Sequence, residues 1–179
     1  ALLAVNWLIS IIRSIRPNAR IIQVGDGGFT TNTILKPGVL PKNCVYIGAI
    51  RKDAKLFEIA TTKTGKITYG DEIRQKPYEM YKDDKPFKVC QNIISGKITD
   101  RQYKTFDRMV LWRKGSQTTP VNIVVAKGLQ YQSSRIATVR RREVAYLVCT
   151  SSELTPAEIC QIYHYRWGIE EQHKELKST

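Results

Sequence analysis

IIQVGDGGFTTNTILKPGVLPKNCVYIGAI, residues 21–50, is the stretch of sequence that decides the fold. Its first part, residues 21–24, is typical of a short strand, and the Gly-Asp-Gly-Gly segment after it predicts a turn. Thr30 or Thr31 can cap a short helix that runs to about Lys36. Residues 45–50 form an unbroken apolar run, which is typical of a strand covered on both faces.

The segments on either side of this stretch complete the predicted core. Residues 2–16 form an apolar helix with one narrow polar side, so we expect most of this helix to be buried. Helix, strand, helix and strand in this order predict parallel strands in an α/β sheet. A second apolar run at residues 144–148 predicts a strand that returns to the same sheet.

The middle of the chain, residues 51–142, has a different pattern. Short strand-like runs alternate there with Gly, Pro and Lys, and the best of them are residues 121–126 and 136–140. This span holds 21 lysines and arginines against 9 acidic residues, while the whole chain of 179 residues has a net charge of +13. We therefore predict a basic, β-rich insertion that carries nearly all of the net charge.

Charge and cysteine content limit the function classes. A net charge of +13 and a pI of about 9.7 favour a nucleic-acid partner, since so basic a chain needs an anionic partner. The four cysteines form no Cys-x-x-Cys pair and only two histidines accompany them, which argues against a zinc finger. Without a disulfide framework, membrane span or signal peptide, the sequence predicts a cytoplasmic protein. Because the chain starts with Ala and stops within a helix, we expect it to be part of a longer protein.

The last predicted helix carries the candidate functional residues. Thr155, Pro156 and Glu158 mark its start as N-cap, first helical residue and capping-box partner, and it should run to the end of the chain. One helical stripe, which includes Ile162, faces the core, and a neighbouring band holds four polar residues: Tyr163, Arg166, Glu170 and Lys177. In an isolated helix this band could be a solvated face with an Arg166–Glu170 ion pair worth about 0.3–0.5 kcal/mol.

The spacing of these four residues resembles a known signature. Tyr, two residues, Arg, three residues, Glu, six residues and Lys is the YREK pattern of one large group of bacterial insertion-sequence transposases, of the Asp-Asp-Glu kind. The residues around Asp26 resemble the segment with the second catalytic aspartate of this family, and residues 51–56, Arg-Lys-Asp-Ala-Lys-Leu, are also similar. The resemblance covers about residues 20–57 and 144–178.

This resemblance implies a fold and a set of roles. The fold would be an α/β, RNase H-like core, a mixed sheet flanked by helices, formed by residues 1–50 and 143–179 and interrupted by residues 51–142. Asp26 and Glu170 would bind two Mg²⁺ or Mn²⁺ ions, and Tyr163, Arg166 and Lys177 would hold the DNA backbone of a transposon end. The reactions would be phosphodiester hydrolysis and strand transfer on double-stranded DNA, carried out by a homodimer. Carboxylates suit this chemistry, because hard oxygen ligands bind these ions well.

The family needs a third carboxylate, the first aspartate, on a strand that precedes the first helix. Residues 1–16 contain no acidic residue, so we expect this aspartate outside the chain and the chain alone to be inactive. The sequence leaves three alternatives open: Asp26 as the first aspartate, a non-catalytic DNA-binding remnant, and a nuclease of the same fold. It also leaves open whether Trp112 stacks on a base or lies in the core, and whether Arg140 to Arg142 bind phosphates or are solvated.

Overall fold

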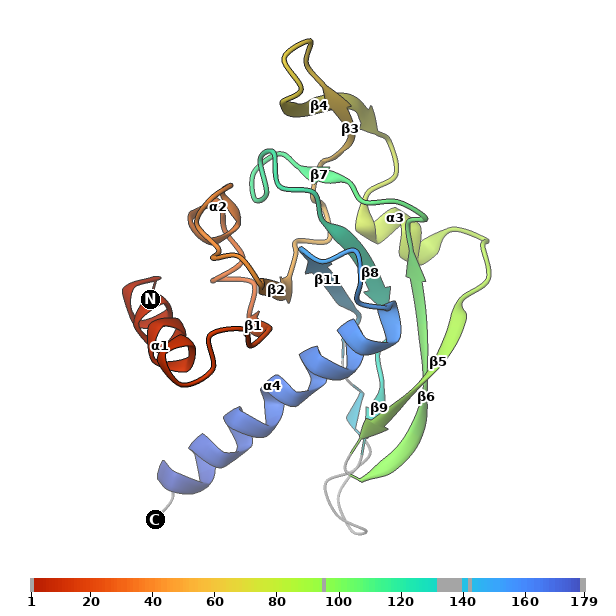
Figure 1. The fold of residues 1–179 in the computed structure, drawn as a ribbon. Coiled ribbons are helices and arrows are strands. Elements are labelled where there is room, and N and C mark those ends of the chain that lie inside the picture. The colour runs from red at the N-terminus through yellow and green to blue at the C-terminus, as the bar shows by residue number, and fades with distance from the viewer. Residues whose placement is uncertain (1, 95, 132–139, 142, 178–179) are drawn as a thin grey trace.

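A six-stranded mixed sheet forms the centre of the molecule (Figure 1). The computed structural model describes residues 2–94, 96–131, 140–141 and 143–177, and of residues 2–5, 130–131, 140–141 and 167–177 it describes the backbone only. The helices are α1 (Leu2–Ile15), α2 (Asn32–Leu35), α3 (Pro77–Lys82) and α4 (Pro156–Lys177). The strands are β1 (Ile21–Gly25), β2 (Cys44–Ala49), β3 (Leu56–Thr61), β4 (Ile67–Ile73), β5 (Lys88–Ile94), β6 (Lys97–Thr105), β7 (Leu111–Trp112), β8 (Asn122–Ala126), β9 (Gln130–Tyr131), β10 (Arg140–Arg141) and β11 (Ala145–Cys149).

The main sheet has the strand order β1-β2-β11-β8-β6-β5. Strands β1 and β2 are parallel, with Ile21 opposite Cys44 and Gly25 opposite Gly48, and every other neighbouring pair in this sheet is antiparallel. The predicted parallel pair is therefore confirmed. The predicted return of residues 144–148 is confirmed too, since β11 lies between β2 and β8.

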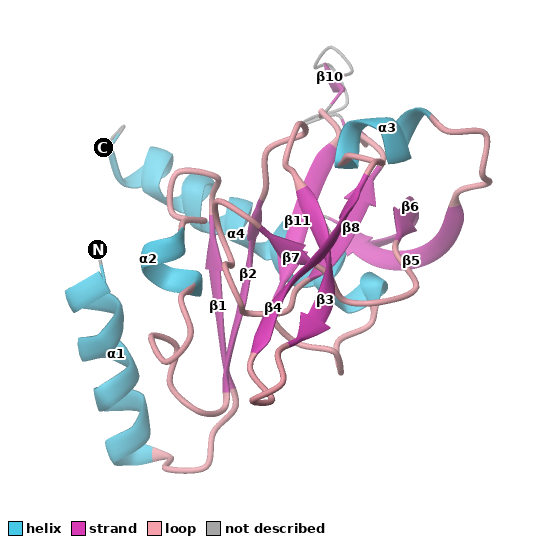
Figure 2. Cartoon of the chain, turned by 90° about the horizontal axis from the view of Figure 1, so that it is seen from above, coloured by secondary structure: helices cyan, strands magenta, loops and turns pink. Residues whose placement is uncertain are grey.

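The two faces of this sheet are covered by different helices. One core cluster joins α2 and α3 to the sheet; its buried members include Leu35, Met80, Tyr46, Val125 and Val148. The other cluster joins α4 to the opposite face; its buried members include Ile159, Cys160, Val45, Ile47 and Leu147. Alternate residues of β2 and β11 thus point to opposite layers, as the period of a strand requires. The molecule is a sheet with a helical layer on each face (Figure 2).

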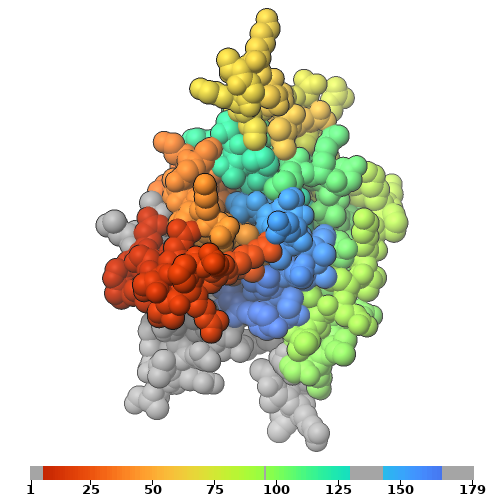
Figure 3. All heavy atoms as spheres, viewed as in Figure 1, coloured from red at the N-terminus to blue at the C-terminus, as the bar shows by residue number. Residues whose placement is uncertain are grey.

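The span from 51 to 142 is rich in strands, and these are shared between two sheets. Strands β5, β6 and β8 extend the main sheet, whereas β4, β3 and β7 form a separate antiparallel sheet. The β3–β4 hairpin projects from the body of the molecule (Figure 3, yellow). Trp112 on β7 is only 7% exposed, so the core interpretation of this residue is confirmed. The treatment of 51–142 as an insertion between 1–50 and 143–179 stays a prediction, and residues 136–139 lie outside the described residues.

The expectation that α1 is mostly buried is wrong. Among its described side chains Ile9 is buried, at 5% exposed, whereas five large apolar side chains are between 37% and 73% exposed: Trp7, Leu8, Ile11, Ile12 and Ile15. The helix lies on the β1 side of the sheet, and β1 is an edge strand (Figure 2), so this strand leaves most of the described apolar side chains of α1 uncovered. Amphipathicity predicted correctly that α1 is a helix, but it does not specify which element covers the apolar side. Within the described residues no helix is both long and apolar enough to cross a membrane.

The start of α4 is fixed by local hydrogen bonds. The backbone N–H of Thr155 donates to Glu158 Oε2 at 2.8 Å, and the backbone N–H of Glu158 donates to Thr155 Oγ1 at 3.3 Å. This reciprocal pair is the predicted capping box, and Pro156 is the first helical residue. The sequence therefore located the beginning of this helix correctly.

A buried ion pair connects β6 to the end of α3. Lys104 is only 5% exposed, and its Nζ donates to the backbone oxygen of Asp83 at 2.7 Å and to the carboxylate of the same residue. Gln75 donates a further hydrogen bond to Asp83 Oδ2 at 2.6 Å. Burial raises the pKa of Asp83, but the hydrogen bonds from Lys104 and Gln75 outweigh it, so the pKa lies below its ordinary value. The ionised carboxylate thus stabilises the fold.

Replacing this carboxylate tests the role of the pair. Asp83→Ala leaves the Lys104 cation buried with one acceptor fewer, so the free energy of unfolding should fall by about 3 kcal/mol. The exposed neighbour Asp84 supplies the control, and Asp84→Ala should change the free energy of unfolding by less than about 0.5 kcal/mol. Urea denaturation at neutral pH measures both.

Because the pKa of Asp83 is lowered on folding, its stabilisation is complete above the unfolded-state pKa of about 3.9 and is lost as the pH falls through the folded-state pKa. The difference between wild type and Asp83→Ala should therefore shrink in acid, and a difference that grows there would contradict this assignment.

Candidate active site at the carboxyl end of strand β1

Asp26 lies in the turn that directly follows β1. Its side chain is exposed, and one carboxylate oxygen, Oδ1, accepts backbone N–H hydrogen bonds from Gly28 at 2.9 Å and Phe29 at 3.2 Å. No hydrogen bond from any described residue reaches the other oxygen, Oδ2. The turn therefore orients the Asp26 carboxylate through Oδ1.

A buried pair of hydroxyl groups holds this turn against the sheet. Thr30, 3% exposed, donates its hydroxyl proton to the backbone oxygen of Asp26 at 2.8 Å and lies 3.1 Å from the hydroxyl of Tyr46. Because the only proton of Thr30 is already used, Tyr46 must be the donor in the second bond. The chain Tyr46 to Thr30 to Asp26 thus links the centre of β2 to the turn.

Two glycines make room for this chain of hydrogen bonds. A Cβ on Gly25 would lie 2.2 Å from the Tyr46 hydroxyl oxygen, and a Cβ on Gly48 would lie 2.3 Å from Thr30 Oγ1. The register places these glycines opposite each other on β1 and β2. Sequence reasoning missed the roles of Thr30 and Tyr46; the paired glycines, one before Asp26 and one in an apolar strand, were the only signal for them.

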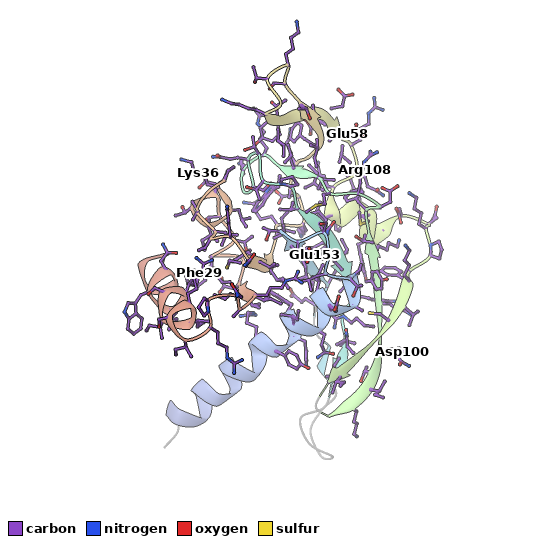
Figure 4. The ribbon with its side chains drawn as sticks, in the orientation of Figure 1. Phe29, Lys36, Glu58, Asp100, Arg108 and Glu153 are labelled. Atoms are coloured by element: carbon purple, nitrogen blue, oxygen red, sulfur yellow. The ribbon has the colours of Figure 1, made fainter. Side chains whose placement is uncertain are left out.

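Helix α4 crosses the sheet toward this turn. It starts shortly after Glu153, which is labelled in Figure 4, and Glu153 forms an ion pair at 3.1 Å with Arg20, the residue just before β1. Asn92 of β5 donates to the backbone oxygen of Ala157 at 3.0 Å, which fixes the first turn of the helix over the far side of the sheet. From there α4 contacts β8, β2 and β1, and its second half extends past the β1 edge (Figures 1 and 2).

Successive residues of β1 face opposite sides of the sheet. Ile22 packs in the core cluster on the α4 side of the sheet. Residues 24 and 26 follow it with a period of two, whereas Gly25 faces Tyr46 in the opposite layer. The alternation of β1, continued by one residue past Gly25, assigns position 26 to the side of the sheet that α4 covers.

Tyr163 and Arg166 lie together on α4. Tyr163 is partly buried against the core cluster below the helix, and the guanidinium carbon of Arg166 lies 5.3 Å from the centroid of its ring. This cation–π contact limits the freedom of the guanidinium. Tyr163 also lines a cavity of about 230 Å³ formed by the ends of β2 and β11 together with Arg101, Cys160 and His164.

The phenol of Tyr46 connects Asp26 electrostatically with Tyr163. Burial raises the pKa of Tyr46, and the nearby groups of Asp26 and Tyr163 raise it further. Asp26 and Tyr163 come from opposite ends of the chain, and both raise the pKa of this phenol.

Glu170 and Lys177 are placed by the backbone of α4 only, because their side chains lie outside the described residues. Glu170 follows Tyr163 by seven residues, so it lies on the same side of the helix and about 10 Å further along its axis. That direction leads to the β1 edge. Among the described side chains no group of three His, Cys, Asp or Glu residues could hold a metal ion.

A basic groove lies near the same end of the sheet. It has a volume of about 380 Å³ and is lined by Arg51, Lys55, Arg113 and Lys114, together with Asp53. Asp53 accepts two hydrogen bonds from Arg51, each 2.9 Å long, which lower its pKa. The remaining cations give this groove a positive charge. It is the most basic of the described pockets near the carboxyl ends of β1 and β2.

Comparison with known proteins assigns the chain to a family. The family model named Transposase DDE domain matches residues 5–179, so the chain belongs to this family. Transposases of this family act on DNA, which they cleave in transposition, and as a class they use divalent metal ions. The resemblance to a transposase is therefore confirmed at the level of the family. No curated protein and no solved structure gives a significant match.

The Thr30 hydroxyl is predicted to position the Asp26 turn. Thr30→Val keeps the shape of the side chain but leaves the buried Tyr46 hydroxyl and the Asp26 carbonyl without this partner, so unfolding should become easier by about 1–3 kcal/mol. Thr31→Val is the matched control, because Thr31 is the N-cap of α2 but its side chain forms no capping hydrogen bond. Thermal or urea denaturation measures both variants, and equal stability of the two would remove Thr30 from this role.

Proposed function

We propose that this chain is catalytic-domain sequence of an insertion-sequence transposase of the YREK group, with an RNase H-like core. Its reactions are metal-dependent cleavage of double-stranded DNA at transposon ends, followed by strand transfer. The observation that carries this proposal is the path of α4, which runs from the far side of the sheet toward the turn with Asp26. Family membership and a net charge of +13 support it.

Asp26 and Glu170 are proposed as two of three metal-binding carboxylates. The exposed carboxylate of Asp26 fits this role, because Mg²⁺ and Mn²⁺ prefer hard oxygen ligands. Divalent ions held by these carboxylates would supply activation of the attacking oxygen and stabilisation of the charge on the leaving oxygen. The chain's own contribution is to hold Asp26 by the Gly28 and Phe29 amides and by the Thr30–Tyr46 pair, and to fix α4 by its capping box.

Tyr163, Arg166 and Lys177 are proposed to bind the DNA backbone beside these carboxylates. A guanidinium that already rests on a phenol ring loses less freedom when it binds a phosphate, and its planar fork suits phosphate oxygens. The basic groove with Arg51, Lys55, Arg113 and Lys114 offers a second set of phosphate contacts. A homodimer in the cytoplasm, acting on two transposon ends, remains part of this proposal.

Substitution of the carboxylates tests the catalytic assignment. Asp26→Asn and Glu170→Gln remove a negative ligand with little change in shape, so DNA cleavage in the active enzyme should fall at least about 100-fold while DNA affinity stays nearly constant. Glu171→Gln is the control, because residue 171 lies off the band that holds Glu170. A cleavage assay with Mg²⁺ and with Mn²⁺ measures the effect. Ordinary cleavage by either Asp26→Asn or Glu170→Gln would remove that residue from the mechanism, and cleavage without strand transfer by the wild type would favour a nuclease.

The salt dependence of binding tests the phosphate contacts. Each cation that neutralises a phosphate releases counterions, so Arg166→Ala, Lys177→Ala and Lys114→Ala should each reduce the slope of log affinity against log salt by about one unit. The loss should be similar for DNA of different sequences, because phosphates carry no sequence information. Anisotropy titrations at several salt concentrations give the slopes. Unchanged slopes for Arg166→Ala and Lys177→Ala would mean that this band of α4 is simply solvated.

A further inference from the structure

A cavity between α4 and the main sheet contains a buried cation. Its volume is about 230 Å³, and α4 contributes Cys160, Tyr163 and His164 to its wall. The sheet contributes the end of β2, the start of β11 and Arg101 of β6. Since a cavity of about 150 Å³ is enough to hold one benzene ring, this one has room for a small organic molecule.

Arg101 lacks an acidic partner within the part of the chain that the structure describes. Its Nε atom is buried without a hydrogen bond, and none of the ion pairs between described residues includes it. Lys104, a buried cation three residues later on the same strand, is bonded to Asp83. Arginine stays protonated in proteins, and a buried charge without a partner is costly. An anion at Arg101 would therefore be stabilised.

The thiols around Arg101 do not supply this anion. Burial lowers the pKa of Arg101, whereas the thiols of Cys160 and Cys90 raise it. Burial raises the pKa of Cys160 to about 12, and it raises the pKa of Cys90 as well. Both thiols are therefore neutral at physiological pH, and a neutral thiol is only a weak hydrogen-bond acceptor.

The rest of the wall determines which anion fits. Its apolar members include Ala49, Ile50, Val144, Ala145 and Leu147. Glu143 also lines the cavity and is exposed to solvent, so a carboxylate lies on the outer part of the wall. Because like charges repel, this carboxylate disfavours a ligand with a second negative charge. The wall therefore suits a compact apolar body with one anionic group.

We propose that this cavity binds a small monocarboxylate with an apolar body, whose two carboxylate oxygens bind the guanidinium of Arg101. The planar fork of a guanidinium matches a carboxylate in this two-point geometry. A phosphate of DNA is the competing occupant. The DNA backbone is a poorer match, because it carries a charge at every phosphate and would bring several charges near Glu143 and the apolar wall.

Benzoate is the probe, and isothermal titration calorimetry at neutral pH measures its binding to the whole chain. Benzamide has nearly the same shape without the charge, and phthalate adds a second carboxylate. Arg101→Met replaces the unpaired cation with an apolar side chain, a change that a buried site tolerates. The exposed Arg74 supplies the matched control, Arg74→Met. Ala145→Leu narrows the cavity and keeps Arg101. Circular dichroism and thermal denaturation show which variants are folded.

The proposal predicts that the wild type binds benzoate with a dissociation constant of about 1 mM or below and unfolds at a higher temperature in its presence. Benzamide and phthalate should bind about 10- to 100-fold more weakly, and Arg101→Met should weaken benzoate binding by the same factor. Ala145→Leu should weaken it too, whereas Arg74→Met should bind as the wild type does. A wild type that does not bind benzoate at this level would overturn the proposal, and so would unchanged binding by folded Arg101→Met.

A duplex oligonucleotide identifies the competing occupant. If it displaces benzoate from the wild type and loses affinity in Arg101→Met, a DNA phosphate occupies the cavity and the proposal is overturned. If Arg101→Met binds the duplex as the wild type does, the loss of benzoate binding is specific to the carboxylate and supports the proposal. Neither result bears on the proposed function, which depends on Asp26 and on the polar band of α4.

Discussion

The packing of α4 against one face of the main sheet is the interaction on which the proposed site depends. Ile159 and Cys160 of α4 are buried against Val45, Ile47 and Leu147, so the apolar side of the helix fixes its direction across the strands. The second half of its backbone then extends past the β1 edge of the sheet. Neither Asp26 nor the residues of the band determine this arrangement; the core beneath the helix does. A change that tilted α4 would therefore disturb the site without touching any of its polar residues.

The sequence predicted those elements that depend on local chemistry. The start of α4 is fixed by three residues that lie within four positions of each other, Thr155, Pro156 and Glu158. The apolar run of β2 marks a strand covered on both faces. Pairings between distant segments were not predictable in this way. Strands β5, β6 and β8 join the main sheet in antiparallel orientation through contacts between residues that are far apart in the sequence. The ion pair between the buried Lys104 and Asp83 depends on such contacts as well. The exposure of α1 was missed because amphipathicity identifies an apolar side but not its neighbour.

Residue spacing predicted the candidate site in outline, and the structure adds contacts between distant segments that spacing does not determine. The positions of Asp26 and of the Tyr163–Arg166 pair follow from a strand end and a helix face. The hydroxyl chain from Tyr46 through Thr30 had no sequence signal except the glycines at 25 and 48, which leave room for these two side chains. A pocket lined by Tyr78, Tyr81 and Tyr146 joins residues from α3 and β11 with the segment after β2, and no local sequence pattern connects these segments. The roles of Asp26 and Glu170 as metal ligands remain predictions.

The central claim is that Asp26 and Glu170 share a divalent metal ion. Anomalous diffraction from crystals of the protein soaked in Mn²⁺ tests it most directly, because the ion is located without any assumption about activity. The account predicts an anomalous peak with a carboxylate oxygen of both residues at a bonding distance of about 2.1 Å, similar to that of Mg²⁺. A saturating soak that places Mn²⁺ elsewhere, or that leaves Glu170 on the opposite face of the sheet from an Asp26-bound ion, would contradict it.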